Sequence, residues 1–460
     1  MGGLFGTDGI RGRAGRGALA PRAVARIAQA VGQLLRKDPA ILSSKAPRGF
    51  EKLRADGPGR GRVLIGRDTR ASGPSIERAL AAGFAAAGVG VVRAGVLSTP
   101  GVAALTRAWG CALGAVISAS HNPAHDNGIK FFSPQGLKMP DGAEEAIELL
   151  LVDGELPTRR GAPAPLTRKP LDDYLDILAP FGPSLKGLTL AVDCAHGASS
   201  ATARPLLERL GARVIVVNAS PDGRNINAGC GALHPEKIAR VVRREKADLG
   251  VAFDGDADRA IFVDETGEVR DGDHVLAVCG THLDERRRLP RRTVVSTVMA
   301  NFGLGRALAA RGIRLLRARV GDRYVAEEML RAGAVLGGEQ SGHMLFFDAS
   351  PAGDGLLTTL RVLGVMAERG EPLSRLSRIL VKYPQTLLNV PVTRKPPLEE
   401  AGGVPKAVAS AEKVLGADGR ILVRYSGTEP LCRVMVEGPR AGMVRRLARA
   451  VADAVRRELA

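Results

Sequence analysis

The strongest chemical signal in the sequence is a serine that follows an apolar segment. Residues 117–123 have the sequence ISASHNP and residues 126–130 have the sequence DNGIK. A strand that runs into small and polar residues and then Asn-Pro must leave its sheet in a tight loop. That loop presents a hydroxyl at the carboxyl end of the strand, where open α/β sheets bind ligands. An ordinary Ser/Asn/Pro turn fits the segment equally well when it is taken alone. A hydrolase triad built on Ser120 and His121 is disfavoured, because no G-x-S-x-G elbow surrounds the serine.

Three aspartates at alternate positions form a candidate metal site. Asp254, Asp256 and Asp258 lie in the segment FDGDADR at residues 253–259. Carboxylates so close together repel one another, and a divalent cation is the simplest group that holds them together. A ligand set made of oxygen alone favours Mg²⁺, which keeps coordination positions for water or a phosphate oxygen. The segment therefore predicts a magnesium site.

This acidic segment has two alternative interpretations. An EF-hand calcium loop would also use Ile261 and Glu265, but Arg259 occupies the position that requires glycine. Residues 249–253 and 260–263 are apolar and indicate strands, whereas an EF-hand needs flanking helices. A phosphatase with an aspartyl nucleophile remains an alternative.

Two polar loops later in the chain could bind a sugar phosphate. The segment GGEQSGH at residues 337–343 surrounds a carboxylate, an amide, a hydroxyl and an imidazole with glycines, and such groups hydrogen-bond sugar hydroxyls. This signal is weak alone, because Gly-rich polar loops are common connectors. The segment RYSGTEP at residues 424–430, with Arg433, combines two guanidinium groups, hydroxyls and backbone N–H donors. That set suits a phosphate dianion, with a surface turn as the alternative.

Alternating helical and extended patterns must position these segments. The apolar spacing over residues 24–35 predicts a helix, as does the composition of residues 74–87. From about residue 383 the pattern changes, and extended segments precede one long C-terminal helix. Strands are expected at residues 63–65, 89–92, 114–117, 188–192, 214–217, 249–253, 294–298, 315–320, 335–336, 421–423 and 433–436, and further helices at residues 201–210 and 235–246.

A chain of 460 residues is too long for a single hydrophobic core and is expected to form several domains. Residues 38–62 are rich in Pro, Gly, Lys and Arg, and we expect an exposed, mobile insertion away from every motif. The Pro-rich residues 154–165 indicate a connection between domains. The predicted fold is therefore α/β, with three similar α/β domains that have mixed sheets and a smaller C-terminal α+β domain. The expected boundaries are residues 1–165 for the serine-loop domain, 166–268 for the metal-binding domain, 269–381 for the sugar-binding domain and 382–460 for the phosphate-binding domain.

Composition and charge restrict the class of protein. Hydrophobic residues make up 45% of the chain and aromatic residues 3%, which fits a globular α/β protein and argues against an all-β sandwich. The formal net charge of +18 suggests an anionic partner. Because the basic residues are dispersed and aromatic residues are scarce, a small anionic substrate is favoured over nucleic acid. The five cysteines form no C-x-x-C motif and no apolar run approaches 18 residues, so we expect a cytoplasmic protein with reduced thiols and no membrane segment.

Together the motifs resemble the α-D-phosphohexomutase superfamily, and within it they are most similar to the bacterial phosphoglucosamine mutases. The opening FGTDGIRG at residues 5–12 and the four segments above occur in the order typical of that family, over nearly the whole chain. The resemblance implies an isomerase that interconverts glucosamine 6-phosphate and glucosamine 1-phosphate and feeds UDP-N-acetylglucosamine synthesis. It also implies a phosphoserine enzyme, a sugar 1,6-bisphosphate intermediate and four domains around a central cleft. A phosphoglucomutase or phosphomannomutase is the alternative, since the choice of glucosamine depends mainly on the GEQSGH and FGTDG segments.

The same resemblance implies a role for each matching residue. Ser120 becomes the phosphorylated serine, and its phosphate would complete a Mg²⁺ shell with the three aspartates. Mg²⁺ and a sugar 1,6-bisphosphate are then the expected cofactors, a sugar phosphate is the expected partner, and a homodimer is left open. The implied positions are Arg11, His121, Lys130 and Arg259 around the reacting phosphoryl group, Glu339 and Ser341 on the sugar with His343 beside them as a further catalytic residue, and Arg424, Ser426, Gly427, Thr428 and Arg433 on the phosphate that does not react.

Overall fold

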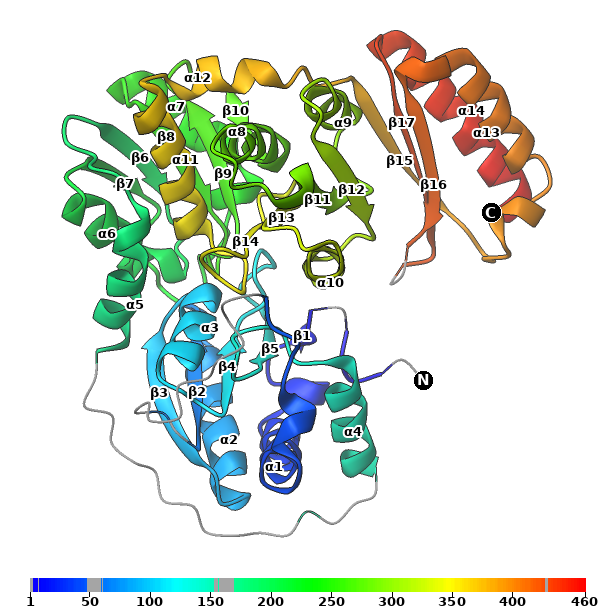
Figure 1. The fold of residues 1–460 in the computed structure, drawn as a ribbon. Coiled ribbons are helices and arrows are strands. Elements are labelled where there is room, and N and C mark those ends of the chain that lie inside the picture. The colour runs from blue at the N-terminus through cyan, green and yellow to red at the C-terminus, as the bar shows by residue number, and fades with distance from the viewer. Residues whose placement is uncertain are drawn as a thin grey trace. The chain divides into compact units, whose positions relative to one another are not determined.

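The computed structural model of the chain describes residues 3–6, 8–47, 59, 61–152, 156, 169–426 and 429–460. They form two compact units, one made of residues 1–299 and 313–378 and the other of residues 300–312 and 379–460. Three mixed sheets lie in the first unit and one antiparallel sheet in the second (Figure 1). The predicted α/β fold with a smaller α+β part at the C-terminus is confirmed.

The first sheet carries the serine loop. Its parallel strands β4, β2 and β3 adjoin the antiparallel pair β5 and β1, and its main core packs α1 and α2 against the strands. A Cβ at Gly83 would collide with the backbone carbonyl of Ala25, so this glycine lets the two helices approach closely. In sheet order the strands are β1 (Ile10–Arg13), β5 (Asp126–Phe132), β4 (Leu113–Ile117), β2 (Arg62–Arg67) and β3 (Gly90–Val96), and the helices are α1 (Pro21–Lys37), α2 (Gly73–Ala86), α3 (Thr99–Ala108) and α4 (Asp141–Val152).

The second and third sheets repeat the same principle, with parallel central strands and an antiparallel edge. The second sheet contains β10 (Val269–Arg270), β9 (Ala260–Asp264), β8 (Leu249–Phe253), β6 (Thr189–Asp193) and β7 (Arg213–Val217), with helices α5 (Pro170–Leu178), α6 (Ala203–Arg209) and α7 (Pro235–Glu245). The third contains β12 (Arg314–Ala318), β11 (Thr293–Thr297), β13 (Leu336–Gly338) and β14 (Met344–Phe346), with α8 (Gly272–Glu285), α10 (Asp322–Ala332), α11 (Gly355–Arg369) and α12 (Leu373–Leu376).

The second unit is built on a three-stranded antiparallel sheet. The predicted strands at residues 421–423 and 433–436 are confirmed, but a third strand and a further helix also occur, so the expectation of one long helix was incomplete. The segment 300–312 belongs to this unit, because the Phe302 N–H donates to Glu437 Oε1 (3.1 Å) and the ring of Phe302 packs edge-on against Tyr383. Its elements are α9 (Phe302–Ala309), β15 (Gln385–Pro391), α13 (Val404–Leu415), β16 (Arg420–Tyr425), β17 (Leu431–Glu437) and α14 (Ala441–Leu459).

The prediction that residues 38–62 form an exposed insertion away from every motif was wrong for its first part. Leu42 is fully buried in the core of the first domain. The Ser44 hydroxyl donates to the carbonyl of Lys138 (2.8 Å), and its N–H donates to the Gln135 side chain (3.2 Å). Ser44 is therefore fixed against the protein and is not part of a free surface loop. Residues 48–58 and 60, and most of the predicted connection at residues 154–165, lie outside the described residues.

The sequence predicts reduced cysteines and no membrane segment. The five cysteines are buried and free, and burial raises the pKa of Cys111, Cys194 and Cys279 to about 12, so these thiols stay protonated at neutral pH. Within the described part of the chain, every helix is too short or too polar to cross a lipid bilayer.

Candidate active site

Ser120 lies in a tight loop directly after β4, as the sequence predicts. Its Oγ donates to Asp254 Oδ2 (2.7 Å) and lies 3.2 Å from His121 Nδ1. The residue adopts a left-handed backbone conformation (φ 53°), which non-glycine residues rarely occupy without support from their surroundings. The neighbouring hydroxyl of Ser118 is fully buried, accepts from the Ser120 N–H (2.9 Å) and donates to Asp68 Oδ2 (2.7 Å). Ser118 is therefore a structural residue, and Ser120 is the serine that faces the acidic segment.

A buried arginine holds the serine loop in this conformation. Arg70 has no exposed surface and forms an ion pair with Asp68, whose carboxylate accepts from its Nε (2.9 Å). The guanidinium also donates to the backbone carbonyls of Ser120 (3.0 Å) and Asn122 (2.8 Å), and to those of Pro123 and Asp126. Planar donors in a fixed fork suit this task, because one guanidinium can meet several carbonyls of the loop at once.

The three aspartates lie in the turn between β8 and β9 and are all buried. One carboxylate oxygen from each of Asp254, Asp256 and Asp258 lies within 4.8 Å of the other two, which is the spacing of ligands around one cation. Strands flank the turn on both sides, so the rejection of an EF-hand is confirmed. The arrangement brings the triad from the second sheet to the serine loop of the first.

The electrostatics of this triad suit the binding of a cation. Burial, together with the neighbouring carboxylates of Asp258 and Asp256, raises the pKa of Asp254 well above its usual value. Burial also disfavours ionised Asp258, but Lys130 and His343 outweigh it and hold the pKa of that carboxyl low. Asp256 Oδ1 and Asp258 Oδ1 are buried and accept no hydrogen bond from any residue that the structure describes. Buried acceptors without donors are costly, and a hard divalent cation such as Mg²⁺ would satisfy them.

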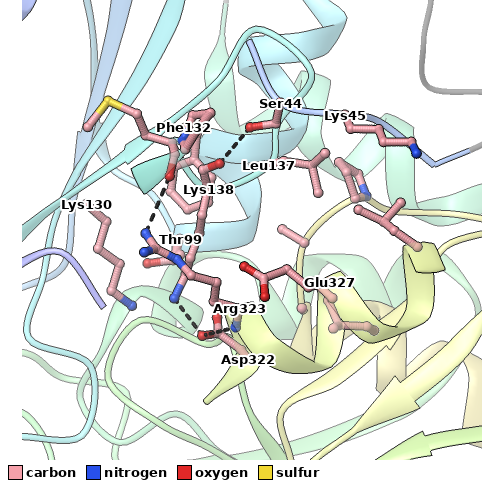
Figure 2. A pocket seen from close by; sticks show the side chains of 18 of the residues that line it. Ser44, Lys45, Thr99, Lys130, Phe132, Leu137, Lys138, Asp322, Arg323 and Glu327 are labelled. Carbon is pink, nitrogen blue, oxygen red and sulfur yellow. Dashed lines mark hydrogen bonds and ion pairs between the residues drawn. The ribbon is translucent and has the colours of Figure 1, made fainter. Parts of the chain in front are cut away.

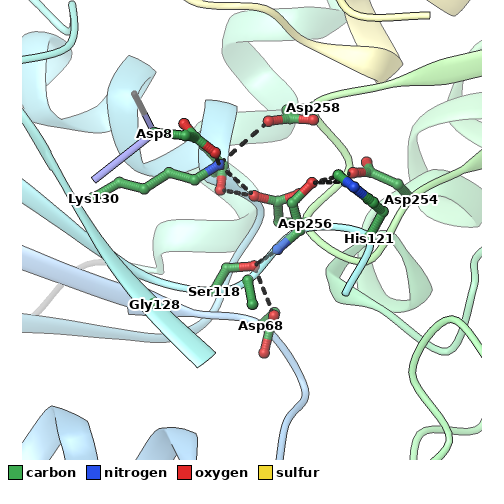
Figure 3. Close-up of polar contacts among 12 residues, drawn as sticks. Asp8, Asp68, Ser118, His121, Gly128, Lys130, Asp254, Asp256 and Asp258 are labelled. Atoms are coloured by element: carbon green, nitrogen blue, oxygen red, sulfur yellow. Dashed lines mark hydrogen bonds and ion pairs between the residues drawn. The ribbon is translucent and has the colours of Figure 1, made fainter. Parts of the chain in front are cut away.

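Lys130 points into the triad from β5. Its amine lies 3.2 Å from Asp256 Oδ2, 3.5 Å from Asp258 Oδ2 and 3.1 Å from Asp8 Oδ2 (Figure 3). Burial lowers the pKa of Lys130, but Asp256, Asp8 and Asp258 outweigh it and raise the pKa well above the usual value, so the amine is charged. Arg11, on β1, pairs with Asp8 and donates to the Ala119 carbonyl (3.4 Å). Both cations thus lie beside the serine loop.

Two further predicted residues, His121 and Arg259, lie at the same place. Burial, followed by Arg259 and Arg11, lowers the pKa of His121 to about 4, so its imidazole is neutral at neutral pH. The Arg259 N–H donates to Asp254 Oδ1 (3.2 Å), and its guanidinium lies 3.7 Å from Asp258 Oδ1. The imidazole therefore adds no charge beside the serine, and the guanidinium is the group that could bind an anion there.

The predicted sugar loop adjoins the metal loop. His343 and Arg259 form an antiparallel backbone bridge, and His343 Nδ1 lies 3.5 Å from Asp258 Oδ1. Burial lowers the pKa of His343, but Asp258 and Asp322 outweigh it and raise the pKa to about 9. Glu339 accepts from the Ser341 hydroxyl (3.1 Å) and from the backbone N–H of Gly321 (2.9 Å). Glu339, Ser341 and His343 are therefore fixed near the triad, and all belong to the same unit.

The predicted phosphate loop lies in the second unit. Arg424 on β16 is the direct cross-strand partner of Arg433 on β17. Burial and the charge of Arg433 lower the pKa of Arg424. Like charges opposite each other destabilise a sheet, and Glu429 offsets part of this repulsion because its Oε2 accepts from the Arg433 guanidinium (2.8 Å). Ser426 is buried beside this pair and its hydroxyl lies 3.4 Å from Glu429 Oε2, whereas Gly427 and Thr428 lie outside the described residues.

Several residues of the site were not singled out from the sequence. The hydroxyl of Thr99 donates to Asp256 Oδ2 (2.6 Å), and Asp68 and Arg70 support the serine loop. The segment GRDTR at residues 66–70, where charged residues directly follow an apolar strand, was a usable signal for the last two. Thr99 carries no comparable signal, because Ser-Thr-Pro at residues 98–100 is also an ordinary helix start.

Comparison with known proteins covers almost the full chain. Four domain families described as phosphoglucomutase/phosphomannomutase match in order: α/β/α domain I over residues 2–155, domain II over residues 172–267, domain III over residues 271–383 and the C-terminal domain over residues 387–454. The phosphoglucosamine mutase of Anaeromyxobacter dehalogenans is 47% identical over 472 aligned residues, which cover 99% of this chain and 98% of the relative.

Solved structures show the same fold at lower identity. A phosphoglucomutase/phosphomannomutase family protein from Burkholderia thailandensis matches with a TM-score of 0.79 and 24% identity, over 98% of this chain and 97% of its own. The Aspergillus fumigatus N-acetylphosphoglucosamine mutase, solved in complex with GlcNAc-6P and magnesium, matches with a TM-score of 0.66 and 18% identity, over 99% and 95%. The four domain matches and the full-length relative show that the chain belongs to the phosphoglucosamine mutases of the phosphoglucomutase/phosphomannomutase family.

Proposed function

We propose that this isomerase interconverts glucosamine 6-phosphate and glucosamine 1-phosphate through a phosphorylated Ser120. The observation that carries the proposal is the 2.7 Å contact between Ser120 Oγ and Asp254, one of three buried carboxylates with the spacing of metal ligands. A phosphate on this hydroxyl would lie directly against a bound cation. The name of the full-length relative supports glucosamine as the sugar.

Asp254, Asp256 and Asp258 are the residues that would hold Mg²⁺, together with the phosphate on Ser120. When bound, the cation would neutralise charge on the phosphoryl oxygens. The complex reported for the Aspergillus fumigatus relative contains magnesium, which supports the same metal here. In the proposed division of labour, residues 1–165 provide the serine, 166–268 the carboxylates, 269–381 the sugar contacts and 382–460 the second phosphate site.

The proposed reaction passes one phosphoryl group each way. A sugar hydroxyl attacks the phosphorus on Ser120, the bond from Ser120 Oγ to phosphorus breaks, and a sugar 1,6-bisphosphate forms. After the bisphosphate reorients, Ser120 Oγ attacks its other phosphate, and the isomeric monophosphate leaves. The phosphoserine is regenerated, so phosphate is conserved and no cofactor is consumed.

The charged groups around the serine have distinct tasks in this scheme. Arg11 and Arg259 offer guanidinium groups to the oxygens of the transferring phosphoryl group. Lys130 is the group we assign to move the proton: its charged amine gives a proton to the leaving Ser120 Oγ and then takes the proton that the attacking hydroxyl loses. His121 is neutral and 3.2 Å from Ser120 Oγ, so it can orient the hydroxyl without adding charge.

The function is tested by following all products from one reaction. Purified protein with Mg²⁺ and a trace of sugar 1,6-bisphosphate is expected to convert glucosamine 6-phosphate to the 1-phosphate, and the reverse, until equilibrium, while free phosphate stays flat by ³¹P NMR. Release of free phosphate at the rate of substrate loss would instead identify a phosphatase. A higher kcat/KM for glucose or mannose phosphate would identify the alternative substrate class.

We expect Arg424→Ala to raise KM and lower kcat together. The proposed clamp on the non-reacting phosphate both binds and orients the sugar, so its loss should cost about 10- to 100-fold in kcat/KM. Phosphorylation of Ser120 and Mg²⁺ affinity should not change. The matched control is Arg446→Ala, which removes the same charge from an exposed position on α14 of the same unit. Wild-type kinetics in Arg424→Ala would make Arg424 an ordinary surface arginine.

A further inference from the structure

Six ionisable side chains form a closed ring beside the candidate active site. Their charges alternate around the ring, and each contacts the next. Lys130 lies 3.1 Å from Asp8, Asp8 contacts Lys138, and Lys138 Nζ lies 2.7 Å from Asp322 Oδ1. Asp322 Oδ2 is 3.6 Å from His343 Nε2, His343 Nδ1 is 3.5 Å from Asp258, and Asp258 is 3.5 Å from Lys130. We call this set, Asp8, Lys130, Lys138, Asp258, Asp322 and His343, the charge ring.

Three members of the charge ring, Asp8, Lys138 and Asp322, form no ion pair or hydrogen bond with the aspartate triad or Ser120 among the described residues. Lys138 follows β5 by six residues, and Asp322 is the first residue of α10. Figure 2 shows Lys138 directed at Asp322 within a cavity of about 380 Å³ that both side chains help to line. Neither residue was assigned a role from the sequence. Lys138 is linked to Lys130 through Asp8, and Asp322 contacts His343 directly.

The ring restricts where Lys130 and His343 can lie. Asp8 contacts Lys130, Lys138 and Arg11 at once, so Lys138 is one of two further cations that fix the carboxylate beside the Lys130 amine. Asp322 holds the far nitrogen of His343, while Gly353 leaves just enough room for its ring, since a Cβ at that position would collide with the imidazole. Asp258 and Asp322 thus lie at ion-pair distance from opposite nitrogens of the imidazole, without hydrogen-bond geometry, and attract the charge of His343 from both sides.

The backbone anchors Asp322 independently of the ring. Its Oδ1 also accepts the N–H of Arg323 (2.9 Å) at the start of α10, and Arg323 binds Glu144 (2.9 Å) on α4. Helix α10 is thereby tied both to Lys138 and to α4. Burial lowers the pKa of Lys138, but Asp322 and Asp8 outweigh it and raise the pKa above its usual value, so the amine is charged.

We propose that Asp322 and Lys138 are positioning residues of the mutase reaction, which act by holding Lys130 and His343 against the metal loop. This inference rests on the proposed function, because it assigns Lys130 and His343 to that same site. A displacement of about 1 Å in a group that contacts the reacting atoms can cost about 100-fold in rate. Loss of either bridge should therefore slow phosphoryl transfer without removing a substrate contact.

The test uses Asp322→Asn and Lys138→Met, singly and combined, on the sugar phosphate that the wild-type enzyme turns over fastest. Each single change is expected to lower kcat about 10- to 100-fold, while KM stays within about threefold. Mg²⁺ affinity should not change, because neither side chain contacts the triad. Since both act through one ring, the double variant should be about as slow as the slower single variant rather than the product of the two losses.

Two further variants separate positioning from general stability. Asp141→Asn removes the exposed ion pair between Asp141 and Arg323, which lies next to Asp322 but outside the charge ring. This variant should keep the wild-type kcat. Lys138→Arg keeps a charge between Asp8 and Asp322 and should be faster than Lys138→Met. If Asp322→Asn does not fold, the comparison of Lys138→Arg with Lys138→Met decides.

Three results would overturn the proposal: kcat within twofold of wild type in the folded single variants, a rise in KM with kcat unchanged, or multiplicative losses in the double variant. The proposed function is judged separately, on the wild-type enzyme alone. A wild type that fails to isomerise glucosamine phosphate but isomerises another sugar phosphate leaves the ring test intact.

Discussion

Ser120→Ala is expected to lose essentially all turnover while it folds like the wild-type protein. Loss of a covalent nucleophile costs about 10⁴-fold or more in kcat, because the remaining groups cannot replace the bond that it forms. The fold should tolerate the change. The loop is held through backbone carbonyls by Arg70 and Asn227, neither of which uses the Ser120 hydroxyl. Turnover, thermal unfolding and intact-mass measurement of the phosphoryl group together check the prediction.

The matched variant for this experiment is Ser118→Ala. Ser118 is two residues away and equally buried, but its hydroxyl is occupied by Asp68 and the Ser120 N–H. The Ser118→Ala protein should still carry the phosphoryl group on Ser120, although its kcat will fall because the loop is held less firmly. If peptide mass spectrometry found the phosphate on residue 118, and Ser120→Ala were active, the phosphoserine assignment would be wrong.

Much of the α/β fold could be predicted because buried strands and amphipathic helices leave local patterns. β4 is apolar at every position and fully buried, and α1 presents Val24, Ile27 and Val31 to the core at helical spacing. The pattern fails where an element is half-exposed. β15 buries one of its seven residues and α13 buries three, so neither produced a clear signal.

The site divides in the same way. Ser120 and the three aspartates lie in short segments whose composition is itself unusual, and the sequence predicts them. The supporting residues contact partners that are far away in the sequence: Lys138 and Asp322 are 184 residues apart, and Thr99 and Asp256 are 157 residues apart. A single Lys, Asp or Thr in a helix or loop has no local feature that marks a buried ion pair. Only the packing of one domain on another makes these contacts.

The same packing explains why residues 38–47 were misjudged. Their polar and Pro-rich composition is typical of a loop, but Ser44 completes the hydrogen bonding of the segment that carries Lys138. Amino-acid composition predicts only the average solvent exposure of each residue type. It does not predict which polar segment will pack over a neighbouring cavity.

Asp256→Asn is expected to abolish both the response to Mg²⁺ and catalysis. Asp256 lies between the other two carboxylates in the chain, and it also accepts from Thr99 and contacts Lys130. The substitution removes one anionic ligand, so the two remaining carboxylates bind the cation more weakly. Because metal-supplied charge stabilisation is worth several kcal/mol, kcat should fall by at least about 100-fold. Removal of metal from the wild type with EDTA should have the same effect, and Mg²⁺ should reverse it.

Thermal unfolding with and without Mg²⁺ gives a readout that does not depend on activity. A cation that binds the folded state alone stabilises it by about 2.7 kcal/mol at a concentration one hundred times its Kd. Wild-type Tm should therefore rise with Mg²⁺, whereas Asp256→Asn should show little or no rise, because its triad no longer offsets the charge of the ion. Asp172→Asn, which removes a carboxylate from an exposed position on α5, should respond to Mg²⁺ like the wild type. An Asp256→Asn protein with the wild-type Mg²⁺ shift and wild-type turnover would mean that the three aspartates do not hold the metal, and that their buried oxygens are satisfied in another way.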